Sequence, residues 1–397
     1  MKVLMVTREF PPYVVGGVGT HTLHLSQAVQ RAGVDVNVIS FGSPKASSGL
    51  VRFVHPKSSI ISRSAYGTGH DLAIIYDIVR YGKILRSVVA KNDYNIVHVQ
   101  EPYVGGFLRA ENKITTVHDT SYGELRSMAT GPSGVREIGK IAFYSTLGFI
   151  EEYASLASSK AIITPAPNIR SELVEKYRIG ADKVITVMNG ASENTFSAIS
   201  KQEAKRSVNI DPAKALVFTT ARHITRKRLD VLLVALSRLN DEGMLNGVEV
   251  RIGGDGPLRS YLERLAESLG IASKVHFTGW LSDDQLSLHL RASDIFVVCS
   301  EYEASPIAVL EAMISGAAVV CTNIQGFPAP SLAKAGVEIL LVPPRHAHAL
   351  ATAIRRLLTD RGLRDGISTN GARFAAQYTW DKVAKRTIGV YEACLAQ

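Results

Sequence analysis

The 397-residue chain has few cysteines and no long apolar run, and each absence argues against a class of protein. Cys299, Cys321 and Cys394 are far apart and form no CxxC pair, which disfavours a disulfide framework and a structural zinc site. The apolar runs are only strand-length, such as Ala317–Cys321, well below the roughly 20 residues that span a bilayer. The N-terminus reads directly into a strand without a signal peptide, so we expect a cytoplasmic protein.

The formal net charge of +9 favours anionic partners, such as nucleotide phosphates, nucleic acid or an acidic membrane surface. No basic motif interleaved with aromatic residues is present, so we expect no nucleic-acid partner. Residues 41–95 carry a series of basic side chains: Lys45, Arg52, Lys57, Arg63, Arg80, Lys83, Arg86 and Lys91. They indicate either peripheral contact with an anionic inner membrane face or ordinary solvated helices and loops, and the sequence leaves both open.

Strand-length apolar runs alternate with helical lengths in two successive series. The first series comprises residues 2–7, 35–40, 96–99, 114–117, 161–164 and 184–187. The second series comprises residues 214–219, 248–252, 274–277, 295–298, 317–321 and 339–342. Strands separated by helices are typical of parallel sheets, because a parallel crossover needs about a dozen residues or more. The sequence therefore predicts an α/β protein with two Rossmann-like domains.

The boundary between these domains is predicted from a turn and a polar stretch. Asn189-Gly190 is a turn signal, and residues 192–200 are polar and irregular. Trp380–Leu395 has the pattern of an amphipathic helix that returns to the first domain. We therefore expect a first domain of residues 1–195 with a helix at about 379–397, and a second domain of residues 196–378.

The clearest local pattern lies after the strand at 295–298. Pro306 fits the first turn of a helix and Ser305 fits its N-cap. The start of such a helix offers N–H groups to a diphosphate, while Glu303 and Glu311 can accept hydrogen bonds from sugar hydroxyls. An ordinary capped helix with two surface acids fits the spacing equally well.

Two further loops follow strands of the second series. Arg222 and Lys227 follow the strand at 214–219, where they could neutralise a departing nucleoside diphosphate in place of a metal ion; a solvated basic loop is the alternative. Gly254 lies in a glycine-rich turn that permits close approach of the backbone. The dinucleotide fingerprint is missing, so a nicotinamide site is only weakly supported.

Candidate groups in the first domain follow the strands at 2–7 and 114–117. Gly16 and Gly17 could offer N–H groups to a phosphate or an acceptor, and the loop lacks the Gly-Lys-Ser/Thr ending of an ATP-hydrolysing P-loop. His118 stands at a carboxyl strand end, where it could bind a sugar or polarise a leaving group. A structural histidine is the competing interpretation.

Taken in order, these segments resemble the family-4 glycosyltransferases of the GT-B fold, whose members are mostly retaining. The resemblance rests on Arg8–Pro12, Gly16–Gly19, Val117–Asp119, Asn189-Gly190, Ala221-Arg222 with Lys227, Gly254–Leu258, Phe277–Trp280 and Glu303–Met313. It implies two Rossmann-like domains facing across a cleft, with the acceptor on the N-terminal side and a UDP-, GDP- or ADP-sugar donor on the C-terminal side. It implies no required cofactor or metal, and it leaves the acceptor open as a carbohydrate, a lipid-linked molecule or a small molecule.

The resemblance also implies residue roles. Arg222 and Lys227 would hold the donor diphosphate, Glu311 the ribose, and Glu303 the hydroxyls of the donor sugar. His118 would contact the sugar near its anomeric centre, and retention would follow from front-face substitution. The remaining donor contacts would come from the backbone of Gly16, Gly17, Gly254, Ser305, Pro306 and Ile307.

The sequence departs from the family pattern at two positions near the expected donor. Arg228 stands where relatives usually have glycine, and Ala304 replaces the glycine after the first glutamate. Neither change removes a donor-binding side chain. A catalytically idle nucleotide-binding scaffold and a nucleotide-sugar epimerase remain alternatives to a transferase.

Overall fold

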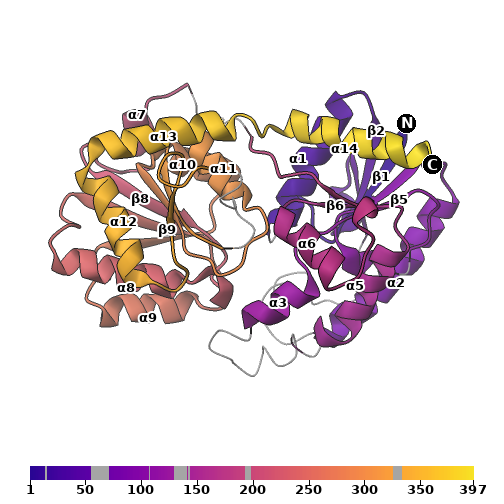
Figure 1. Ribbon diagram of the computed structural model, residues 1–397, viewed down its shortest axis with the longest axis horizontal. Coiled ribbons are helices and arrows are strands. Elements are labelled where there is room, and N and C mark those ends of the chain that lie inside the picture. Colours follow the sequence, from indigo (N-terminus) through magenta and orange to yellow (C-terminus); the bar gives the residue numbers. More distant parts are fainter. Residues whose placement is uncertain are drawn as a thin grey trace. The chain divides into compact units, whose positions relative to one another are not determined.

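The computed structural model describes residues 1–13, 16–54, 71–106, 108–128, 141, 144–192, 198–324 and 333–397 (Figure 1). Val14, Val15, Lys57 and Arg63, and the side chain of Arg80, lie outside the described part of the chain. The chain divides into two compact units, one of Met1–Gly190 with Trp380–Gln397 and one of Ala191–Thr379. None of the described helices is both long and apolar enough to cross a membrane.

In its described residues, the first unit contains a seven-stranded parallel sheet in the order β3-β2-β1-β4-β5-β6-β7. Its strands are β1 (Lys2–Val6), β2 (Asp35–Phe41), β3 (Val51–Val54), β4 (Ile96–Val99), β5 (Lys113–Thr116), β6 (Ala161–Thr164) and β7 (Val184–Thr186). The sequence analysis missed β3. This edge strand alternates buried Val51 and Phe53 with exposed Arg52, so it is not a continuous apolar run.

Helices of the first unit include one that comes from the far end of the chain. Those in the described residues are α1 (Gly17–Arg31), α2 (Asp71–Ala90), α3 (Ser121–Met128), α5 (Leu147–Ala157), α6 (Pro167–Glu175) and α14 (Trp380–Leu395). Helix α14 packs along α1 (Figure 1), where Arg31 and Asp381 form an ion pair at 2.6 Å. Tyr391 of α14 also contacts the buried ring of His98 in β4, with 2.7 Å between its hydroxyl and Nδ1. The unit therefore includes the C-terminal helix, and its boundary lies at Gly190, five residues before the predicted one.

The second unit contains, in its described residues, a six-stranded parallel sheet in the order β10-β9-β8-β11-β12-β13. Its strands are β8 (Ala215–Thr220), β9 (Val248–Gly253), β10 (Val275–Gly279), β11 (Ile295–Val298), β12 (Ala318–Thr322) and β13 (Leu340–Val342). Its helices are α7 (Lys201–Ser207), α8 (Leu229–Asp241), α9 (Arg259–Ser268), α10 (Asp283–Ala292), α11 (Ile307–Ile314), α12 (Ala347–Thr359) and α13 (Arg361–Ala375). The prediction of two parallel α/β domains is confirmed.

Alternation along the central strands gives this second sheet two apolar faces. Val217 of β8 packs with residues of α8, α9 and α12, whereas its neighbours Leu216 and Phe218 pack with residues of α7, α10, α11 and α13. Helices thus cover both faces of the sheet, as the continuous apolar strands require. The strand order reverses between β8 and β11 here, and between β1 and β4 in the first unit. Open α/β sheets bind ligands beyond the carboxyl ends of the strands at such reversals.

Candidate functional site

Most of the predicted donor residues of the second unit follow three adjacent strands. Gly254 follows β9, Arg222 and Lys227 follow β8, and Glu303 follows β11. Glu311 lies in α11, the helix after β11. The structure therefore brings these residues to the carboxyl edge of the sheet, where its strand order reverses.

Gly254 allows two of these loops to touch through their backbones. Its φ is +96°, and a Cβ at this position would lie 2.1 Å from the carbonyl oxygen of Ala221. The loops are also joined by hydrogen bonds from Ala221 N–H to Gly253 O at 3.2 Å and from His223 N–H to Asp255 O at 2.9 Å. The glycine loop therefore fixes the backbone that carries Arg222.

Lys227 and Glu303 form an ion pair between Nζ and Oε1. The same carboxylate oxygen accepts a hydrogen bond from Ser300 Oγ at 2.7 Å. Burial by itself would raise the pKa of Glu303, but Lys227, Arg226 and the two hydrogen bonds outweigh it and hold that pKa below its usual value. Glu303 is therefore a buried, ionised carboxylate whose main counter-ion is the lysine expected to hold phosphate.

Arg228 ties the loop after β8 to the loop after β11. Its backbone is left-handed, with φ 48° and ψ 41°, a conformation that glycine adopts more readily than arginine. Its guanidinium donates to both carboxylate oxygens of Asp230, at 3.1 and 2.8 Å, and to Glu301 Oε1 at 2.7 Å. The Glu301 carboxylate also accepts a hydrogen bond from Arg345 Nε. The backbone N–H of Glu301 donates to Arg226 O at 2.9 Å. These contacts offset the backbone cost of a side chain at this position.

The left-handed backbone gives a testable difference between two variants of Arg228. Arg228→Ala and Arg228→Gly lose the same ion pairs, but only the alanine variant keeps a Cβ at positive φ. We expect the glycine variant to be the more stable of the two by about 1 kcal/mol in free energy of unfolding. Urea denaturation of both variants measures this difference, and equal stabilities would contradict the assigned backbone conformation.

The helix after β11 begins one residue later than predicted. Pro306 has an extended backbone (φ −68°, ψ 111°) and occupies the N-cap position, so the predicted N-cap role of Ser305 is wrong. The reason is that α11 starts at Ile307, which leaves the proline ring outside the first turn. Further along α11, burial, with a smaller contribution from Asp283, raises the pKa of Glu311 to about 7. This carboxyl group therefore changes charge near neutral pH.

In the first unit, His118 follows β5 and Gly16 and Gly17 lie at the start of α1. The Gly16 N–H donates to Glu9 Oε2 at 3.0 Å, so one of the two proposed backbone donors already has an acceptor within the protein. Burial lowers the pKa of His118 to about 4, so its ring is neutral at pH 7. A neutral imidazole can both donate to and accept from a hydroxyl group.

The sequence analysis missed His21, which lies beside His118. The two rings are 4.5 Å apart between centroids and meet edge to face. His21 Nδ1 lies 3.0 Å from Asn189 Oδ1, whereas Nε2 of His21 and Nε2 of His118 have no hydrogen-bond partner among the described residues. His21 lies four residues after Gly17, about one turn further along the same face of α1. This spacing could have indicated His21 as a site residue.

The backbone after His118 is held by three hydrogen bonds at the start of α3. Ser121 N–H donates to Glu152 Oε2 at 3.0 Å, and Tyr122 N–H donates to Tyr177 Oη at 3.1 Å. Gly123 N–H donates to Thr120 Oγ1 at 3.0 Å. The acceptors of the first two lie in α5 (Glu152) and just after α6 (Tyr177), so nothing in the local sequence around His118 predicted them.

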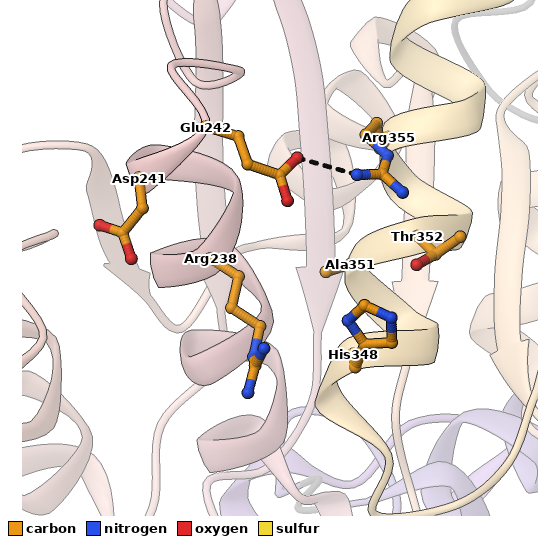
Figure 2. Close-up of a pocket in the computed structure, with 7 residues that line it drawn as sticks. All are labelled: Arg238, Asp241, Glu242, His348, Ala351, Thr352 and Arg355. Carbon is orange, nitrogen blue, oxygen red and sulfur yellow. Dashed lines mark hydrogen bonds and ion pairs between the residues drawn. The ribbon is translucent and has the colours of Figure 1, made fainter.

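A surface hollow elsewhere in the second unit contains none of the predicted site residues. It lies between α8 and α12 and is lined by Arg238, Asp241, Glu242, His348, Ala351, Thr352 and Arg355 (Figure 2). Arg355 Nη1 and Glu242 Oε2 form an ion pair at 3.1 Å across it, and both side chains are about two-fifths exposed. The arrangement is an ordinary solvated contact between two helices.

Family models match both halves of the chain. The model of glycosyltransferase family 4 matches residues 15–194, and the model of glycosyl transferases group 1 matches residues 200–374. An uncharacterized glycosyltransferase from Methanocaldococcus jannaschii is 25% identical over 406 residues, covering 100% of this chain and 99% of the relative. The two matched segments are consecutive and correspond closely to the two units.

Solved structures show the same architecture. Sucrose-phosphate synthase from Thermosynechococcus elongatus has a TM-score of 0.81 and 18% identity, covering 100% of this chain and 99% of the other. HepE from Anabaena, solved in complex with UDP-glucose, has a TM-score of 0.73 and 15% identity, covering 99% and 100%. At this level of identity the similarity to solved structures shows the fold alone. The glycosyltransferase activity is indicated by the two family models. The chain therefore belongs to the family-4-like glycosyltransferases of the GT-B fold.

Proposed function

We propose that the second unit binds a nucleoside diphosphate sugar at the carboxyl edge of its sheet and that the enzyme transfers this sugar to an acceptor. The observation that supports the proposal most directly is the ion pair between Lys227 and Glu303. It lies beyond the carboxyl ends of β8 and β11, where the strand order of the sheet reverses. A cation suited to a diphosphate and a carboxylate suited to sugar hydroxyls lie side by side there.

The chemistry follows from the charges around this point. When the bond between the sugar and the diphosphate breaks, negative charge grows on the departing phosphate oxygen. Arg222 and Lys227 would stabilise that charge from fixed positions, because the loops that carry them are tied to their neighbours by backbone hydrogen bonds. The Ser305–Ile307 backbone at the start of α11 and the close-packed turn at Gly254 would complete the donor contacts.

In the first unit, His118 would contact the transferred sugar, and Gly16 and Gly17 the phosphate or the acceptor. The neutral imidazole of His118 supports this role, because it can hydrogen-bond a hydroxyl without carrying charge. Retention of the anomeric configuration is part of the proposal and rests on the family resemblance alone.

The acceptor is proposed to be a carbohydrate or a lipid-linked sugar. Of the basic series in residues 41–95, the side chains of Lys45, Arg52, Lys83, Arg86 and Lys91 are exposed. Their exposure supports peripheral contact with an anionic membrane, and such binding should weaken strongly as salt is raised.

The proposal is tested by calorimetric binding of UDP, GDP, ADP and TDP and their common sugars to the full chain. UDP-glucose is the first ligand, because the Anabaena neighbour was solved with it. We expect one nucleotide to bind, and its sugar to reach an acceptor glycan in product analysis. A sugar nucleotide converted without transfer would favour an epimerase, and no binding by any member of the panel would contradict the proposal.

The pH dependence of the same titrations tests the role of Glu311. Ribose hydroxyls bind best to the ionised carboxylate, and the pKa of Glu311 is about 7, so donor binding should release a proton below that pH. We expect weaker donor binding at pH 6 than at pH 8, by up to about tenfold. The pH dependence should disappear in Glu311→Gln; if it persists there, another group controls it.

A further inference from the structure

Lys227 and Glu303 form an ion pair with each other, although the proposed function assigns Lys227 to the diphosphate of the donor and Glu303 to its sugar. The pair is largely shielded from water, with side chains 17% and 10% exposed. Its carboxylate is also held from the sheet, since Ser300 Oγ donates to Glu303 Oε1 at 2.7 Å and Ser300 O accepts from Thr322 Oγ1 at 2.5 Å. Glu303 is thus fixed against the ends of β11 and β12 with its charge directed at Lys227.

A nucleoside diphosphate that binds Lys227 competes with the Glu303 carboxylate for the same ammonium group. The ammonium group has three hydrogens, so it can either leave Glu303 or hold both anions at once. In the first case a shielded carboxylate loses its main counter-ion, which is unfavourable. In the second case the carboxylate and the terminal phosphate lie on the same ammonium group and repel each other. Both arrangements oppose the binding of a nucleoside diphosphate.

An intact sugar nucleotide removes this conflict in two ways. Its sugar carries hydroxyl groups that can donate to Glu303 and replace the hydrogen bond from Lys227. Its terminal phosphate is also a diester, so it lacks the second ionisation, near pH 6, that a terminal phosphate monoester undergoes. The carboxylate that repels the diphosphate is therefore a favourable contact for the donor.

We infer that Glu303 determines specificity by making the site prefer the intact donor over the nucleoside diphosphate that the reaction releases. The inference rests on the proposed function, because it needs the diphosphate at Lys227 and the sugar at Glu303. One consequence is that Lys227 can pair with Glu303 again once the sugar has been transferred. That pairing favours release of the nucleoside diphosphate and limits its inhibition of the enzyme.

The test compares UDP with UDP-glucose, or the matching pair for another base, by calorimetry on the full chain and on Glu303→Gln. The unaltered protein should bind the sugar nucleotide at least as tightly as the diphosphate. In Glu303→Gln, where the repelling charge is gone, we expect the diphosphate to bind about tenfold more tightly and the sugar nucleotide more weakly. The preference between the two ligands should therefore reverse.

Glu303→Asp is the matched control, because it keeps the negative charge and shortens the side chain. It should weaken binding of the sugar nucleotide without tightening binding of the diphosphate. Equal tightening in both variants, or an unaltered protein that binds UDP well above UDP-glucose, would overturn the inference while leaving the proposed function intact. Absence of binding by every ligand to every variant would overturn both. Thermal unfolding of each variant shows that the binding differences belong to folded protein.

Discussion

Replacing Lys227 with alanine is expected to lower kcat/KM for sugar transfer by about 100- to 1,000-fold, comparable to loss of one fixed group that stabilises developing charge. Two effects contribute. The departing diphosphate would lose the cation that is proposed to stabilise it, and Glu303 loses the counter-ion with which it pairs in the structure. The uncompensated carboxylate then repels the phosphates of the donor. Steady-state kinetics with the donor identified by the binding panel measure the loss.

Lys214→Ala provides the control for Lys227→Ala in the same unit. The side chain of Lys214 is 45% exposed and its ion pair with Glu249 spans 3.9 Å, so its removal should change kcat/KM by less than about twofold. Circular dichroism establishes that both variants are folded. A folded Lys227→Ala protein with full turnover would show that this lysine does not hold the donor diphosphate.

Replacing Gly254 with alanine is expected to have the second large effect, on both stability and activity. The new Cβ would lie 2.1 Å from Ala221 O and 2.9 Å from Ala221 C, at a φ of +96°. The backbone cannot yield without moving the loop that carries Arg222. We expect a loss of about 3 kcal/mol in free energy of unfolding, from the strained φ and the clash together. Displacement of Arg222 by about 1 Å would lower turnover about 100-fold.

Gly270→Ala separates the clash from the strain. Gly270 also has a positive φ, +68°, but apart from its chain neighbours no atom of the described residues lies within 4 Å of the position of a Cβ. This variant should lose only about 1 kcal/mol and keep its activity. Urea denaturation and kinetics on both variants make the comparison. If the two variants are equally stable and equally active, the close approach to Ala221 is not what fixes the loop.

Much of the fold could be read from local sequence, because parallel strands are buried on both faces and appear as continuous apolar runs. The predicted runs Ile295–Val298 and Ala317–Cys321 coincide closely with β11 and β12. The failures have the same origin. Buried and exposed side chains alternate in β3 because it is an edge strand with Arg52 exposed, so it is not a continuous apolar run. The predicted start of α11 depended on Pro306, and residue spacing does not decide whether a proline lies at the N-cap or in the first turn.

The sequence by itself determined the class of fold, the order along the chain of the described strands other than β3 and, through an ordered set of motifs, the family. Those properties depend on residues close together in the chain, where periodicity and turn chemistry act. Tertiary structure alone decided which groups meet: Lys227 with Glu303, Arg228 with Glu301, and His21 with His118. Their members are 76, 73 and 97 positions apart, so only the pairing of β8 with β11, and the packing of α1 beside the first sheet, could bring them together.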